Sequence, residues 1–243
     1  MNYVGVDLHK QAAYFHVVNQ NGEKILSRNI STDRTILEQL FRELPPPFEV
    51  AVETTYNWSF FVDLAEQYAQ KVHLANAYEL KAFARRNKKN DRIDAKLIAD
   101  VLWKGYLPTV TIADQPTRAW RALLYYRMKL VSDRCRIICR LKGLLDSLGW
   151  ITTGNFTTEK RLKEIDQVPL EASYVCIAQG YREQISQLNQ RIVNINQTIK
   201  DRSNESSEIQ RLLTIPGLSY FSASLILAEI ITIDRFKRFN QLC

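Results

Sequence analysis

Cysteine is scarce in this 243-residue sequence, and its spacing excludes two common uses. The four cysteines form no Cys-x-x-Cys pair, which argues against a redox motif or a zinc knuckle. Cys135 and Cys139 share a helical face but have no neighbouring His or Cys that would complete a zinc site. We therefore interpret Cys135, Cys139, Cys176 and Cys243 as reduced thiols, as expected in a cytoplasmic protein.

Long apolar runs and a secretory leader are also missing. No stretch reaches the roughly 18 apolar residues that are needed to cross a bilayer. The opening "MNYVGVDLHK" has no basic segment followed by an apolar run, so we do not interpret it as a signal peptide. Apolar residues make up 46% and charged residues 24%, which is typical of a globular protein and predicts no membrane association.

Positive charge is plentiful and is concentrated in the centre of the chain. The net charge is +7, yet residues 81–142 alone hold sixteen Lys or Arg and five Asp, a local +11. The rest of the chain therefore sums to −4. A basic centre between mildly acidic ends favours a localised polyanion-binding surface over general basicity, so we expect nucleic acid as a partner.

Hydrophobic periodicity predicts a mixed α/β layer in the first part of the chain. Strand patterns cover residues 3–8, 13–18, 24–30, 48–53 and 71–77, and helical patterns cover residues 31–44 and 58–69. A further helical pattern runs from Tyr78 to Lys104 with a break at "NKKN", and "GYLP" closes the region near Pro108. The order β-β-β-α-β-α-β is typical of a mixed α/β fold, and we place the first domain at 1–108.

Two long helices are predicted to follow. The first spans about residues 115–148 and carries basic residues with interleaved aromatics. The second repeats Ala178, Tyr181, Ile185, Leu188, Ile192, Ile195 and Ile199 at alternating spacings of three and four, which indicates a short coiled-coil seam. Its partner could be the preceding helix, another subunit, or both. We assign 109–200 to this segment and 201–243 to a further helical domain.

Four carboxylates could form one metal site. Asp91 and Asp94 lie three residues apart at the start of a predicted helix, and by themselves they could equally be ordinary helix-dipole or salt-bridge partners. Asp7 lies between apolar residues of a strand, and Glu53 ends another strand, where an unpaired charge is costly. Together they offer the oxygen ligands that Mg²⁺ prefers, and two Mg²⁺ ions could clamp a phosphodiester.

The surrounding cations would then hold the nucleic-acid backbone. The candidate nucleic-acid-binding residues are Arg85, Arg86, Lys88, Lys89, Arg92, Arg118, Arg121, Arg127, Lys129, Arg134, Arg136, Arg140 and Lys142.

Four motifs together resemble the DEDD insertion-sequence transposases, of the pilin-gene-invertase-like or bridge-RNA-guided type. "YVGVDLHK", "AVETTYNW" and "KNDRIDAKLIA" resemble the three motifs of their catalytic domain, and "IPGLSYFSASLILAEI" resembles the start of their C-terminal domain. The resemblance implies a RuvC/RNase H-like catalytic domain in which Asp7, Glu53, Asp91 and Asp94 bind Mg²⁺. It also implies DNA transposition or recombination guided by a structured bridge RNA in the bacterial cytoplasm. The long helices would bind that RNA and form a homodimer or homotetramer.

The sequence departs from this pattern in three places. Tyr56 replaces a glycine of the second motif, and Ser219 stands where a second glycine of a helix-hairpin-helix turn is frequent. The segment expected to carry a nucleophilic serine is missing before Cys243, so we expect a truncated chain that binds metal and nucleic acid without forming a serine–DNA bond.

Two other functions suit the same residues. One is a Mg²⁺-dependent nuclease resembling Holliday-junction resolvases, in which water attacks the phosphodiester. The other is a non-catalytic remnant that only binds nucleic acid and oligomerises. The third motif and the C-terminal turn favour the transposase.

Overall fold

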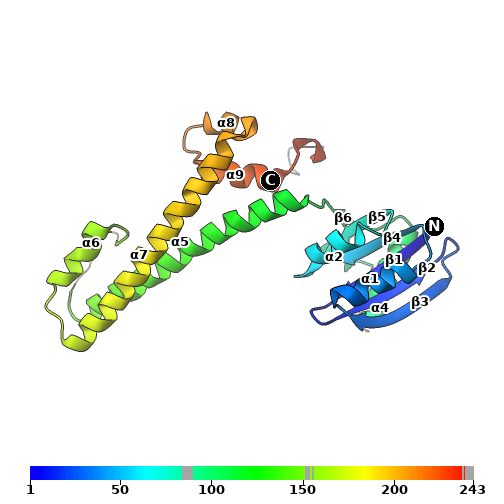
Figure 1. Cartoon of the computed structure of the whole chain (residues 1–243), viewed down its shortest axis with the longest axis horizontal. Coiled ribbons are helices and arrows are strands. Elements are labelled where there is room, and N and C mark those ends of the chain that lie inside the picture. The colour runs from blue at the N-terminus through cyan, green and yellow to red at the C-terminus, as the bar shows by residue number, and fades with distance from the viewer. Residues whose placement is uncertain (84–89, 151–153, 155, 237, 239–243) are drawn as a thin grey trace. The chain divides into compact units, whose positions relative to one another are not determined.

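The computed structural model describes residues 1–83, 90–150, 154, 156–236 and 238. The chain divides into two compact units, Met1–Ile112 and Ala113–Cys243 (Figure 1). Of the predicted functional residues, Arg85, Arg86, Lys88 and Lys89 lie outside the described residues, as does Cys243. The division into domains at 1–108, 109–200 and 201–243 stays a prediction.

The first unit is built on a six-stranded sheet with the order β3-β2-β1-β4-β5-β6. Its strands are β1 (Asn2–Leu8), β2 (Ala12–Val18), β3 (Lys24–Ser31), β4 (Phe48–Glu53), β5 (Lys71–Ala75) and β6 (Thr109–Val110). Strands β1, β4 and β5 are parallel to one another, whereas β2, β3 and β6 join through antiparallel pairs. The carboxyl ends of the three parallel strands therefore lie at one edge of the sheet.

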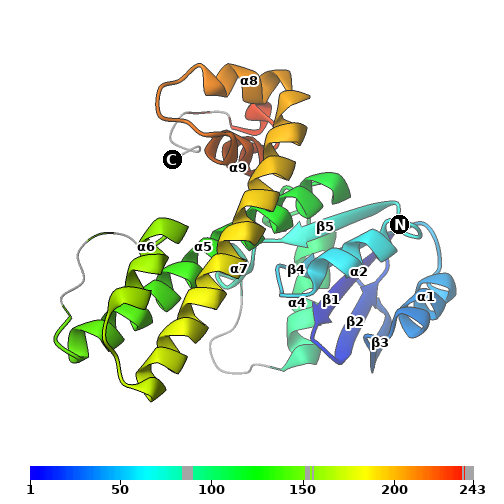
Figure 2. The same ribbon diagram turned by 60° about the vertical axis from the view of Figure 1, so that its left-hand side comes forward.

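The two faces of the sheet differ because alternate side chains of a strand point to opposite faces. Val4 and Val6 of β1 face the main apolar core, which they share with α1 (Arg34–Glu43) and α2 (Trp58–Ala65). The opposite face holds a smaller core around Ala51 under α4 (Asp91–Trp103), beside the short α3 (Ala77–Leu80). Figure 2 shows α4 against the strands on the side away from α1 and α2.

The second unit is helical, and its largest feature is an antiparallel pair of long helices, α5 (Gln115–Ser147) and α7 (Ala172–Asn204). Arg127 of α5 donates a hydrogen bond to Asn196 of α7. Arg134 lies seven residues after Arg127 in α5 and donates to Asn189, which lies seven residues before Asn196 in α7, so the two helices run in opposite directions. The predicted seam thus packs within the chain, and its buried residues are Ala178, Ile185, Ile192 and Ile199. Helix α6 (Glu159–Glu164) and a 3₁₀ turn, η1 (Ile165–Gln167), connect the pair.

The last helices, α8 (Ser207–Leu213) and α9 (Tyr220–Ile230), precede a 3₁₀ turn, η2 (Ile233–Arg235). Gly217 between α8 and α9 has φ +91°, a conformation that favours glycine. Ser219 caps α9, since its hydroxyl accepts from the backbone N–H of Ser222 at 3.1 Å. Trp120 and Leu124 of α5 form a small core here with Ile199 of α7 and Ala228 of α9.

This arrangement confirms the predicted fold class, a mixed α/β sheet domain of RuvC/RNase H-like type followed by long helices. None of the helices among the described residues combines the length and the apolar composition that a bilayer-spanning segment requires. Cys135, Cys139 and Cys176 are free thiols at exposed positions.

Candidate functional site

Asp7 is a buried carboxylate near the carboxyl end of β1. It follows Tyr3 and Gly5 on the face toward α4, and the residue is 5% exposed. Glu53 ends the parallel neighbour β4, and the register Val6↔Val52 makes Glu53 the next residue beside Asp7. The backbone therefore brings both predicted strand-end acids to the same edge of the sheet.

Gly5 explains why α4 can lie so close to β1. A Cβ at this position would overlap the carbonyl oxygen of Ala95 and the backbone nitrogen of Ala99, so the helix backbone rests directly on the strand. The helix begins at this edge because Asn90 caps it, its side-chain oxygen accepting from the N–H of Arg92 at 3.0 Å. This contact places the first turn of α4, which carries Asp91 and Asp94, over the end of β1.

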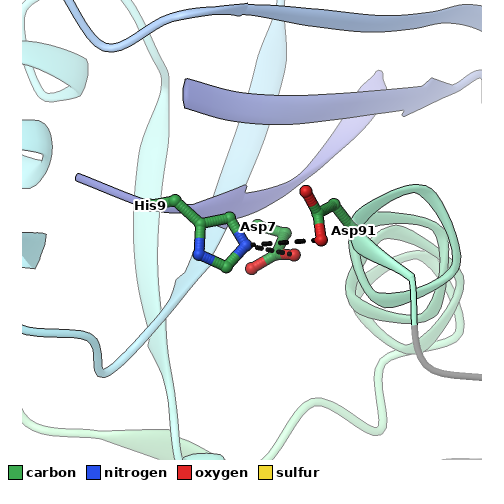
Figure 3. Close-up of side chains that lie close together, drawn as sticks. All are labelled: Asp7, His9 and Asp91. Carbon is green, nitrogen blue, oxygen red and sulfur yellow. Dashed lines mark hydrogen bonds and ion pairs between the residues drawn. The ribbon is translucent and has the colours of Figure 1, made fainter. Parts of the chain in front are cut away.

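Asp7, His9 and Asp91 lie close together, as Figure 3 shows. One potential ligand atom from each lies within 4.8 Å of the others. The Nε2 atom of His9 lies 3.1 Å from Oδ2 of Asp7 and 3.5 Å from Oδ1 of Asp91. The ring therefore occupies the space between two carboxylates that come from different elements.

The electrostatics of the group favour a cation. Burial is the main cause that raises the pKa of Asp7, and the negative charges of Asp91 and Asp94 raise it further. His9 opposes these effects through its charge and its hydrogen bond to Asp7. A bound divalent cation would offset the same repulsion more strongly, because it carries two charges.

The predicted set and the observed group overlap in part. Asp7 and Asp91 belong to both the predicted set and the observed group. His9 had no predicted role, and the fold brings it into the observed group. Asp94 lies close enough for its charge to raise the pKa of Asp7, and Glu53 lies beside Asp7 on β4. Among the described residues, neither Asp94 nor Glu53 belongs to the 4.8 Å group. The assignment of all four carboxylates as metal ligands stays a prediction.

Many of the predicted basic residues of α5 bind their own unit. Three of them donate to backbone carbonyl oxygens: Arg118 to Ala113 at 2.6 Å, Arg121 to Ala228 at 2.8 Å and Lys142 to Gly154 at 2.5 Å. Two others donate to side-chain amide oxygens: Arg127 to Asn196 at 3.1 Å and Arg134 to Asn189 at 2.9 Å. Lys129, Arg136 and Arg140 are exposed on α5, and Arg136 pairs with Asp133 at 2.8 Å. Arg92 is exposed on α4.

Comparison with known proteins places the chain among transposases. Residues 4–149, more than half of the chain, match the family model of IS110-type DEDD transposases, which is described as "Transposase". The chain is 26% identical over 228 residues to the transposase for insertion sequence element IS1328 of Yersinia enterocolitica, covering 93% of this chain and 67% of that protein. It is 24% identical over 246 residues to a probable family 20 transposase of Pseudomonas aeruginosa, and the match covers 99% of this chain and 72% of that protein. It is also 27% identical over 176 residues to the transposase for insertion sequence element IS1111A of Coxiella burnetii, and the match covers 70% of this chain and 47% of that protein.

Proposed function

Since this chain belongs to the IS110-type DEDD transposase family, we propose that it acts in DNA transposition or site-specific recombination. In this proposal it is an enzyme that activates a DNA phosphodiester through Mg²⁺ held by Asp7, Glu53, Asp91 and Asp94. The observation that carries the proposal is the approach of Asp7 on a strand and Asp91 on a helix to a common point, with one ring between them.

The residues present fit a divalent cation. Aspartate and glutamate oxygens are the ligands that Mg²⁺ prefers, and the partly exposed edge leaves room for the waters that Mg²⁺ retains. When bound, such ions stabilise the charge that develops on the attacking and leaving oxygens of a phosphodiester. His9 has an exposed ring, so it can turn aside without disturbing the buried core.

Each carboxylate has a separate part in this proposal. Asp7 is the most buried and is anchored by β1, so it fixes the position of the site. Asp91 and Asp94 enter from α4, and Glu53 enters from the neighbouring strand. The serine nucleophile that the family resemblance implies is not among the residues that we assign.

Exposed cations would hold the nucleic acid. Lys129 and Arg140 on α5 and Arg92 on α4 are exposed, so each could bind a phosphate. We propose DNA as the substrate and a structured guide RNA as a second partner. We also propose a homodimer or homotetramer formed through the long helices, acting in the cytoplasm.

Metal binding by the whole chain tests the site directly. We expect the chain to bind Mn²⁺ in competition with Mg²⁺, measured by electron paramagnetic resonance, and Asp7→Asn to weaken binding more than about tenfold. The matched control is Glu66→Gln, which removes an exposed carboxylate outside the site and should leave binding unchanged. Equal Mn²⁺ affinity in Asp7→Asn and the unmodified chain would rule out the proposed site.

The reaction products separate transposase chemistry from hydrolysis. With branched DNA and Mg²⁺, free 5′-phosphate ends that disappear in Asp7→Asn would indicate attack by water, and hence a nuclease. Nucleic-acid binding that no carboxylate substitution changes, without any cleavage, would instead indicate a binding module.

A further inference from the structure

Two tyrosine side chains project into solvent at the edge of the sheet that carries the acidic group. Tyr56 is 88% exposed and Tyr78 is 82% exposed, the highest values among the exposed large hydrophobic residues that the structure describes. Glu53 and Ala75 are paired in the register of β4 and β5, and each tyrosine lies three residues beyond its member of this pair. Because β4 and β5 are parallel, both rings lie beyond the same carboxyl edge.

Hydrogen bonds fix the loop of Tyr56 to both neighbouring strand ends. The N–H of Thr54 donates to the carbonyl oxygen of Ala75 at the end of β5, at 3.3 Å. The side-chain amide of Asn57 donates to the carbonyl oxygen of His9, at 3.0 Å. Tyr56 thus directly precedes Asn57, which is bonded to His9. His9 in turn contacts Asp7 and Asp91.

Neither ring has a role in holding the fold. Across the described residues, the rings and hydroxyls of Tyr56 and Tyr78 make no hydrogen bond and no ring contact, whereas structural tyrosines of the same unit do. Tyr68 stacks on Phe41, and Tyr14 bonds the hydroxyl of Ser27 at 3.1 Å. Two solvated aromatic rings at the same edge of the sheet as the proposed phosphodiester site are therefore available to a ligand.

We propose that Tyr56 stacks on an unpaired nucleobase of the DNA strand whose phosphate lies at Asp7 and Asp91. An aromatic ring offers every base a flat apolar surface, and such stacking is largely independent of sequence. A base inside a duplex is already stacked on its neighbours, so the site selects an unpaired or extruded nucleotide. This inference rests on the proposed function, since it assigns the position of the base next to the phosphate that is activated.

The test measures binding of the whole chain to a labelled single-stranded DNA of about twelve nucleotides by fluorescence anisotropy. Ca²⁺ replaces Mg²⁺ so that binding is measured with a cation of the same ligand preference. We expect Tyr56→Ala to weaken binding about 5- to 150-fold, which corresponds to about 1–3 kcal/mol for the loss of one stacked base. Tyr56→Phe keeps the ring and should stay within about twofold of the unmodified chain.

The salt dependence distinguishes stacking from charge. Tyr56→Ala should leave the slope of log affinity against log salt unchanged, because no phosphate contact is removed. Tyr174→Ala removes a partly exposed tyrosine from α7 and should leave the affinity unchanged. Mn²⁺ binding should also stay unchanged in Tyr56→Ala, so failure of the stacking inference is separable from failure of the metal site.

Three outcomes would overturn the inference. Full affinity in Tyr56→Ala would exclude the ring, and equal weakening by Tyr56→Phe would show that the hydroxyl acts instead. A single-stranded RNA of the same sequence is the third arm. If Tyr56→Ala weakens binding of the RNA and leaves binding of the DNA unchanged, the ring contacts RNA and the assignment to the DNA strand is wrong.

Discussion

Asp7 illustrates how a single residue departs from the pattern of its element. Its neighbours Val6 and Leu8 are buried in the main core, as period-two alternation requires. On the other face the fold buries a carboxylate next to Asp91, which raises the pKa of Asp7 and destabilises its charged form. Among the residues that the structure describes, His9 is the side chain that hydrogen-bonds the Asp7 carboxylate, and a buried charge with so little compensation is a reason to expect function at this position.

His16 leads to a prediction about stability at the residue scale. It lies on β2 opposite Gly5, is 4% exposed, and has its Nδ1 atom 3.3 Å from the hydroxyl oxygen of Ser27. Burial is the main cause that lowers the pKa of His16. The negative charge of Asp100 opposes this effect, whereas the positive charges of Lys96 and Lys24 lower the pKa further. The unfolded chain therefore takes up a proton at a higher pH than the folded protein.

The sign of the pH dependence follows from this difference. The stability associated with neutral His16 is fully present above the unfolded pKa, near 6.5, and is lost as pH falls from there toward the lower folded pKa. In His16→Gln, which cannot titrate, the loss of unfolding free energy between about pH 7 and 5 should be smaller. The slopes of unfolding free energy against pH in the two proteins cannot differ by more than about 1.4 kcal/mol per pH unit, and urea unfolding across this range measures both slopes. Identical slopes in both proteins would contradict the prediction.

At the scale of elements, the contact of α4 with β1 decides where the acidic group forms. The helix meets the strand without any side chain between them at Gly5, while Ile98 and Leu102 pack with Ala51 in the smaller core. Moving the helix outward would carry Asp91 away from Asp7. The position of the predicted metal ligands therefore depends on a residue that binds no metal.

Gly5→Ala tests this dependence. The added methyl group must displace the backbone of α4 at Ala95 and Ala99, and we expect a loss of about 1–3 kcal/mol in the free energy of unfolding. Mn²⁺ affinity should also fall by more than about tenfold. Thermal unfolding and electron paramagnetic resonance measure the two effects.

Gly180→Ala is the matched control for Gly5→Ala. Gly180 lies in α7, where a Cβ would have open space around it, so alanine should stabilise the helix by about 0.5–1 kcal/mol and leave Mn²⁺ binding unchanged. If Gly5→Ala behaved like this control, the close approach of α4 to β1 would not control the site.

At the scale of the whole molecule, each compact unit has its own apolar core. The sheet unit buries Phe15 and Phe41, whereas the helical unit buries Leu141 and Ile185 between its long helices. Arginines of α5 bonded to asparagines of α7 add specific polar contacts to this second core. The proposed metal site lies wholly within the sheet unit.

Ile185→Ala should therefore damage one unit only. Ile185 is fully buried, and its truncation should cost about 2–5 kcal/mol in the unfolding free energy of the helical unit. Mn²⁺ affinity should stay unchanged because the cores are separate. Val193→Ala, at a position 59% exposed on the same helix, should change stability by no more than about 0.5 kcal/mol. Calorimetric unfolding with parallel Mn²⁺ titration tests this, and loss of metal binding in Ile185→Ala would contradict it.

Sequence patterns were sufficient for the fold class because they are local. Alternation at Val4 and Val6 predicted β1, and the repeat through Ile185, Ile192 and Ile199 predicted the long second helix, both of which the structure confirms. The same patterns left the partner of that helix open. Its packing on α5 depends on side chains more than fifty residues apart, such as Arg134 and Asn189.

The amino-acid sequence by itself determined strands β1 to β5, the two long helices, the concentration of positive charge, and four acids at element ends. Only the tertiary structure decided that His9 lies between Asp7 and Asp91, that Gly5 seats α4, and that Arg121 and Arg127 bind their own unit. The physical reason is the separation along the chain of the residues that make each contact. A periodic pattern reflects contacts between near neighbours, whereas each of these features depends on how closely two distant segments approach.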